Sequence, residues 1–96
     1  MSLRVCALSI ELHLPLTHSL KEKRAVVRPV LDGLHNRFRV SVSEVDHHDL
    51  WQRCTIGVAV VGATARHVED VLDSCERFIW SFPELEVIRS ERSWLE

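Results

Sequence analysis

Basic side chains gather in one short stretch of the sequence: Lys21, Lys23, Arg24 and Arg28. Three of them, Lys21, Arg24 and Arg28, are spaced i, i+3 and i+7, so on a helix they share one face. Cations at a helix start oppose the helix dipole, at a cost of about 0.3 to 1 kcal/mol each at low salt, while free N–H groups there attract anions. The cluster, with its side chains expected near the surface, is therefore a candidate site for phosphate or an RNA backbone. A solvated face that nearby carboxylates neutralise is the preferred interpretation of the charges alone.

A second segment, Asp46-His47-His48-Asp49, has the chemistry of metal ligands. The letters Asp-His-His are similar to the motif of a family of phosphoesterases, but those enzymes need further acidic motifs on a much larger scaffold. Adjacent histidines on a strand or turn point apart and rarely share one ion without other ligands. A polar hairpin loop, with Asp46 and Asp49 neutralising the basic cluster, is the preferred interpretation. A small metal-dependent hydrolase is the alternative, and no metal ligand is assigned.

Periodicity predicts the elements that position these groups. Residues 3–14 alternate, which indicates a strand, and Ser19 with Glu22 forms a capping box for a helix over about 20–37. Pro29 lies inside that helix and should bend or break it. Residues 38–46 and 51–62 are β-branched and alternate, which predicts a hairpin.

Thr64 can cap a second helix, which Pro83 closes, and a last edge strand follows from about residue 85. The order β-α-β-β-α-β predicts an α+β, ferredoxin-like fold: a four-stranded antiparallel sheet with two helices on one face, in a single domain over residues 1–96. In this topology the start of the first helix and the loop of residues 46–50 are neighbours, about 10 Å apart.

Composition excludes several classes of protein. Hydrophobic residues make up 46% and charged residues 27%, which argues against disorder, and no apolar run approaches the roughly 20 residues that span a bilayer. Neither a membrane span nor a secretory leader is expected. Residues 1–40 hold seven Lys/Arg against three Asp/Glu and residues 41–96 hold five against eleven, so the basic patch is local. Cys6, Cys54 and Cys75 match no paired motif and are predicted to be reduced core residues of a cytoplasmic protein.

The exposed face of the predicted sheet has small side chains and no aromatic ring. RNA-recognition domains of this topology stack bases on such rings, so that mode of binding is disfavoured. A flat face of small residues permits close approach of a second copy, and we expect a homo-oligomer; a hydrated face is the alternative. The candidate partner interface consists of Trp51, Arg53, His47 and His48, although Trp51 could equally cap the end of the core.

The segments Ser19–Arg24 and Glu44–Arg53 resemble the two signatures of the YlxP-like bacterial family, catalogued as domain of unknown function 503. The likeness runs over residues 3–95 and implies a ferredoxin-like fold. The family has no established reaction, so the resemblance implies no catalytic residue. Its members are often encoded beside genes of translation initiation and ribosome maturation, which implies a ribosomal role by association only. The acylphosphatases share this size and topology, but residues 15–19 lack their Gly-rich loop and its Arg.

These observations predict a cytoplasmic, non-catalytic binding module without a cofactor. Its expected partners are a second copy of the chain and RNA or a ribosomal particle, with no membrane and no small-molecule cofactor.

Overall fold

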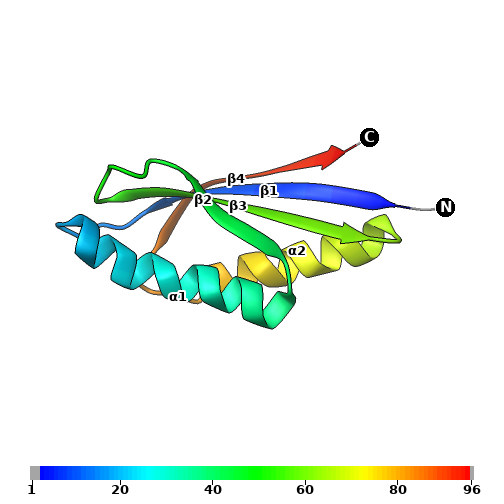
Figure 1. Ribbon diagram of the computed structural model, residues 1–96, viewed down its shortest axis with the longest axis horizontal. Helices are drawn as coiled ribbons and strands as arrows, with labels where there is room; N and C mark the ends of the chain where they lie inside the picture. Colours follow the sequence, from blue (N-terminus) through cyan, green and yellow to red (C-terminus); the bar gives the residue numbers. More distant parts are fainter. Residues whose placement is uncertain (1–2, 96) are drawn as a thin grey trace.

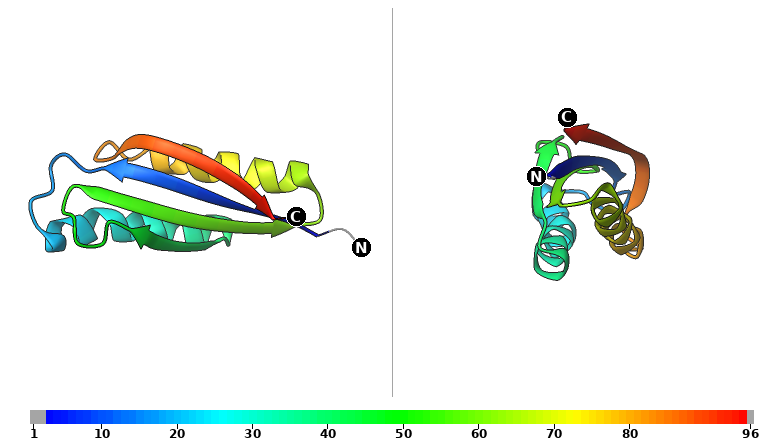
Figure 2. Two further views of the ribbon diagram at one scale, coloured as in Figure 1. Left: turned by 90° about the horizontal axis from the view of Figure 1, so that it is seen from above. Right: turned by 90° about the vertical axis from the view of Figure 1, so that its right-hand side faces the viewer.

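Within residues 3–95, which the computed structural model describes, four strands and two helices follow one another in the predicted order (Figure 1). They are β1 (Arg4–His13), α1 (Leu20–Phe38), β2 (Ser41–Asp46), β3 (Arg53–Gly62), α2 (Ala65–Trp80) and β4 (Glu86–Leu95). The strands form one antiparallel sheet in the order β2-β3-β1-β4, and both helices cover the same face of it (Figure 2). The predicted ferredoxin-like fold is confirmed.

Both helices begin at the predicted caps. Ser19 has an extended backbone (φ −160°), and its Oγ accepts the N–H of Glu22 at 3.0 Å. Thr64 does the same for His67 at 3.1 Å. Each cap satisfies a backbone donor that the helix itself cannot pair, which fixes where the helix starts.

Pro29 does not break α1, because the helix runs without interruption from Leu20 to Phe38. The predicted bend at Pro29 stays a prediction. Pro29 cannot donate a hydrogen bond to the carbonyl of Ala25, four residues earlier. Both residues are exposed, so water can hydrogen-bond to that carbonyl in place of the missing N–H.

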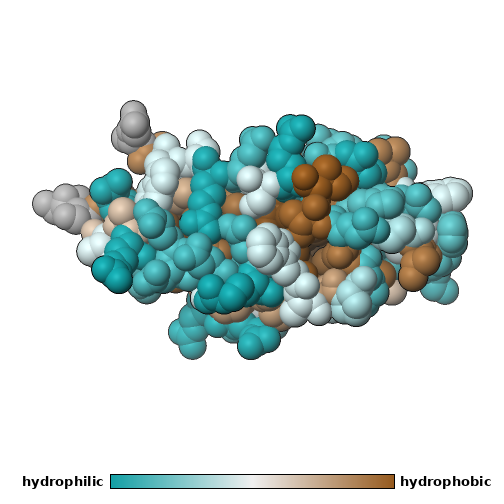
Figure 3. Space-filling view, turned by 180° about the vertical axis from the view of Figure 1, so that it is seen from behind, coloured by the Kyte–Doolittle hydropathy of each residue, from teal (hydrophilic) through white to brown (hydrophobic). Residues whose placement is uncertain are grey.

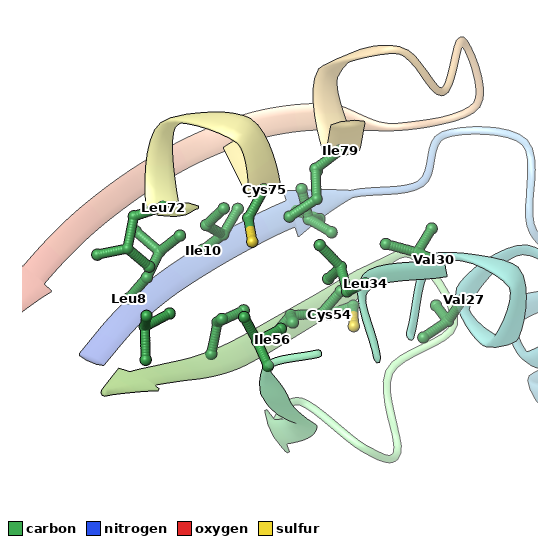
Figure 4. Close-up of a cluster of buried hydrophobic side chains, with 14 of the residues drawn as sticks. Leu8, Ile10, Val27, Val30, Leu34, Cys54, Ile56, Leu72, Cys75 and Ile79 are labelled. Carbon is green, nitrogen blue, oxygen red and sulfur yellow. The ribbon is translucent and has the colours of Figure 1, made fainter. Parts of the chain in front are cut away.

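The core lies between the sheet and the helices (Figure 4). The alternation of β1 sends Leu8 and Ile10 into it, where they meet Leu34 of α1 and Leu72 and Ile79 of α2. All five side chains are at most 1% exposed. The packing of both helix stripes onto one side of the sheet therefore accounts for the layer order.

The three cysteines are free and buried in this core, as predicted. Burial, with Glu44 next in effect, raises the pKa of Cys54 to about 12, and burial followed by Glu76 raises that of Cys75 to about 11. Because a thiol reacts as its thiolate, Cys54 and Cys75 are held in an unreactive form at neutral pH.

The opposite face of the sheet carries no helix and is lined by the predicted small residues. All four strands contribute to a shallow hollow of about 410 Å³, where Ala7, Ser9, Gly57 and Ala59 lie at the centre. Figure 3 views a different side of the molecule, from behind, where the surface is mostly hydrophilic and the largest hydrophobic area lies right of the centre. No helix within residues 3–95 is long and apolar enough to cross a membrane.

Candidate functional site

Lys23 is buried, so its predicted position near the surface is wrong. Its side chain is only 3% exposed, and its Nζ lies 2.8 Å from Oε2 of Glu44 on β2. The same Nζ donates a hydrogen bond of 2.7 Å to the carbonyl of His47 and contacts that of His48 at 3.5 Å. Lys23 thus joins the start of α1 to β2 and to the hairpin loop, and its positive charge is neutralised inside the protein by Glu44.

Glu44 neutralises Lys23 in place of the expected Asp46 and Asp49. Asp46 instead accepts the backbone N–H of His47 at 2.7 Å. The predicted proximity of the helix start to the hairpin loop is confirmed, because Lys23 touches both loop carbonyls.

Helical spacing explains why Lys23 points inward. The buried residues of α1 are Lys23, Val27, Val30 and Leu34, at i, i+4, i+7 and i+11. Lys23 therefore continues the apolar face of the helix at its first turn, where the sheet offers Glu44 rather than a hydrophobic side chain. This spacing is visible in the sequence and would have distinguished Lys23 from its neighbours.

The other three cations of the cluster, Lys21, Arg24 and Arg28, are exposed, as predicted. Within residues 3–95 no carboxylate forms an ion pair with any of them. The basic face of α1 therefore keeps three uncompensated positive charges, in contrast to Lys23.

A cleft of about 280 Å³ lies beside two of these charges, between α1 and β2. Arg24 and Arg28 border it, and Leu20, Val27 and Leu31 contribute apolar surface. The lining also includes Lys23, Glu44 and His48. A site with an apolar floor and guanidinium groups at its border can hold a planar ring and an attached phosphate together.

Backbone N–H groups at the start of α1 are already hydrogen-bonded to the capping residue Ser19. The Oγ of Ser19 accepts a hydrogen bond from the N–H of Glu22, and its carbonyl accepts one from the N–H of Lys23. The Glu22 carboxylate lies 3.4 Å from the same Oγ, so a negative charge already stands at the positive end of the helix dipole. The attraction for an external anion consequently lies further along α1, at the arginines.

The two histidines of the hairpin loop have separate partners. His47 Nδ1 lies 2.9 Å from Thr55 Oγ1, and His48 Nε2 lies 3.0 Å from the carbonyl of Glu44. Among residues 3–95 no three His, Cys, Asp or Glu side chains are grouped so that they could hold a metal ion. The arrangement does not favour the alternative of a metal-dependent hydrolase.

Residues predicted as a partner interface border two different hollows of the surface. Trp51 is half exposed and lines a shallow hollow with Arg53, while His48 borders the cleft of α1. Arg53 also forms an ion pair with Glu11 on the open face of the sheet. Their role at an interface stays a prediction.

The fold and the basic cleft define an α+β, ferredoxin-like protein, and comparison with known proteins gives its family. Residues 5–92 match the family described as Protein of unknown function (DUF503). Over 76 residues the chain is 42% identical to the "Uncharacterized protein YlxP" of Bacillus subtilis (strain 168), an alignment that covers 79% of this chain and 83% of that protein. The chain belongs to the DUF503 family, as its two sequence signatures indicated.

A solved structure supports the fold alone. The "De novo designed protein Foldit4" is 13% identical to this chain, with a TM-score of 0.56 over 99% of this chain and 100% of that one.

Proposed function

We propose that this protein is a cytoplasmic, non-catalytic binding module that holds single-stranded RNA, free or within a ribosomal particle, in the cleft between α1 and β2. The observation that carries the proposal is that Arg24 and Arg28 border this cleft without an acidic partner in residues 3–95. Free, buried cysteines fit a reducing compartment.

The chemistry of the cleft matches a nucleotide. Arginine binds phosphate oxygens through its planar fork of donors and also stacks on base rings. The accessible apolar surface of Leu20 and Leu31 suits the face of a base, while Lys21, one turn before Arg24, extends the positive charge along the backbone path. Within residues 3–95 the open sheet face has no Phe, Tyr or Trp ring on which a base could stack, so the cleft is the better candidate.

The patch is local, which favours a specific contact over general attraction to polyanions. The whole chain has a formal net charge of −2, and α2 carries Glu69, Asp70, Asp73 and Glu76 on its surface. A phosphate backbone is therefore attracted at the basic face of α1 and repelled near α2.

The test compares two triple variants that lose the same charge. Lys21→Gln, Arg24→Gln and Arg28→Gln remove the basic face of α1, whereas Arg39→Gln, Arg66→Gln and Arg77→Gln remove exposed charges elsewhere. The probes are a labelled single-stranded RNA of mixed sequence and purified ribosomal particles. Wild-type affinity for the RNA should fall with added salt by a log–log slope of roughly −0.7 per neutralised phosphate, and only the first variant should flatten that slope.

Two results would overturn the proposal. One is a wild-type protein that binds neither probe at low salt. The other is an equal loss of affinity in both triple variants, because net charge rather than the cleft would then explain the binding.

A further inference from the structure

One edge of the sheet is long and exposed. β4 pairs with β1 on one side, and eight of its ten residues are exposed, whereas the opposite edge strand, β2, has only six residues. Figure 2 shows β4 along this margin of the sheet. An edge strand presents unpaired N–H and C=O groups that can pair with a strand from another chain.

We infer that two copies of this chain associate through β4, paired antiparallel about a two-fold axis at Ser90. The charges on the open face of β4 carry the inference. Arg89 and Glu91 lie opposite Glu11 and Ser9 of β1, and both side chains are 67% exposed, with their charged groups 3.7 Å apart within the strand. An axis at Ser90 sets Arg89 opposite Glu91 of the second copy and, by symmetry, Glu91 opposite Arg89 of the second copy. Each dimer therefore replaces the two intrastrand Arg89–Glu91 pairs, which are long and exposed, by two cross-strand ion pairs between the copies.

Neighbouring registers are unfavourable. A continuous sheet keeps the open faces of both copies on the same side, so the axis must pass through a residue position. An axis at Arg89 sets two arginines opposite each other, and an axis at Glu91 sets two glutamates opposite each other. Like charges directly opposite destabilise a strand pair, so the charge pattern favours Ser90 over both neighbouring positions.

The helix-facing side of β4 is compatible with this register. Arg92 adds no free charge there, because its guanidinium lies 2.7 Å from Asp73 and 2.5 Å from Glu76. Ile88, which is 48% exposed, is the extra residue at the register shift between Glu11 and Leu12 of β1, so the regular part of β4 begins at Arg89. The small side chain of Ser90 leaves room at the axis.

The symmetry also explains why β4 would pair with itself. Pairing β4 with β2 of another copy would leave a free edge at each end and could continue without limit. A β4 pair closes, because each copy uses the same strand, and both long edges are covered at once.

Charge reversal provides the test. Arg89→Glu and Glu91→Arg should each weaken the wild-type dimer roughly tenfold or more, since both ion pairs become like-charge pairs. An equimolar mixture of the two variants should recover a heterodimer, and the double variant should recover a homodimer. Arg66→Glu, an exposed charge reversal on α2, is the control and should leave the dimer unchanged. Sedimentation velocity over a concentration series measures each case.

A cross-link tests the register. With oxidised glutathione, Ser90→Cys should form a covalent dimer, because the two positions are directly opposite. Ser93→Cys should not, because six residues of strand separate it from its counterpart by about 20 Å. The native cysteines are buried and do not compete.

A monomeric wild type at high concentration would overturn the inference, as would mixtures that fail to associate or a faster cross-link at Ser93 than at Ser90. None of these measurements involves RNA, so their outcome is independent of the proposed function.

Discussion

Replacing Lys23 by alanine should destabilise the fold far more than replacing Lys21. Lys23 is 3% exposed and neutralises Glu44, whose side chain is 21% exposed and whose Oε2 is buried. Without Lys23 this carboxylate and the carbonyls of His47 and His48 lose their cation. Removing one partner of a buried pair costs about 3 to 5 kcal/mol.

The effect is large for a domain of this size. About 3 kcal/mol corresponds to a drop in Tm of roughly 12 to 24 °C, since 1 kcal/mol shifts Tm by about 4 to 8 °C in domains of 60 to 100 residues. Lys21→Ala is the matched control, because Lys21 is exposed, has no ion-pair partner in residues 3–95 and should change the free energy of unfolding by no more than about 0.5 kcal/mol.

Urea unfolding followed by tryptophan fluorescence measures both variants. The double variant Lys23→Met with Glu44→Leu should recover part of the loss, because no buried charge then remains alone. Equal stability of Lys23→Ala and Lys21→Ala would refute the assignment of Lys23 as a buried tie between α1 and the hairpin.

Further predictions concern the core and its thiols. Ile79→Asp should unfold the domain, because it buries a charge without a partner at a position that is 0% exposed, and circular dichroism should show the loss of structure. Trp80→Asp, at an exposed neighbouring position, should remain folded. Val71→Asp should lower the free energy of unfolding less than Ile79→Asp, because Val71 is only half-buried. Cys54 and Cys75 have their pKa raised from 9.0 to about 12 and about 11, so their thiols stay neutral in the fold while those of the unfolded chain ionise. The two thiols should therefore leave the free energy of unfolding unchanged below about pH 9 and lower it as the pH rises from there toward 12. Urea unfolding midpoints measured at about pH 8 and about pH 10.5 would show the difference. Cys54→Ala should reduce this pH dependence, and an unchanged dependence in that variant would show that other groups cause it.

Local sequence patterns were sufficient to predict the helices, the strands and their order along the chain. Ser19 and Thr64 mark both helix starts because a cap depends on residues three positions apart, and the alternation of β1 marks its buried face because a strand has a period of two. The sequence did not exclude a break at Pro29, since the cost of the proline depends on whether the carbonyl of Ala25 can reach water, which the sequence does not state.

The site was only partly predictable: helical spacing could have marked Lys23 as buried, but neither its partner nor the cleft can be read from one segment. Lys21, Lys23 and Arg24 look alike as a basic run, yet only Lys23 continues the buried face of α1. The role of Glu44 depends on β2 reaching the first turn of α1, and the cleft depends on the spacing between those two elements. Such distances arise from tertiary packing and leave no pattern within a single segment.

The most direct test of RNA binding in the cleft of α1 is the affinity of a labelled single-stranded RNA, measured at low salt for both triple variants. We predict a sharp loss for Lys21→Gln, Arg24→Gln and Arg28→Gln, and affinity close to that of the wild type for Arg39→Gln, Arg66→Gln and Arg77→Gln. Equal affinity of the two variants would contradict the proposed function.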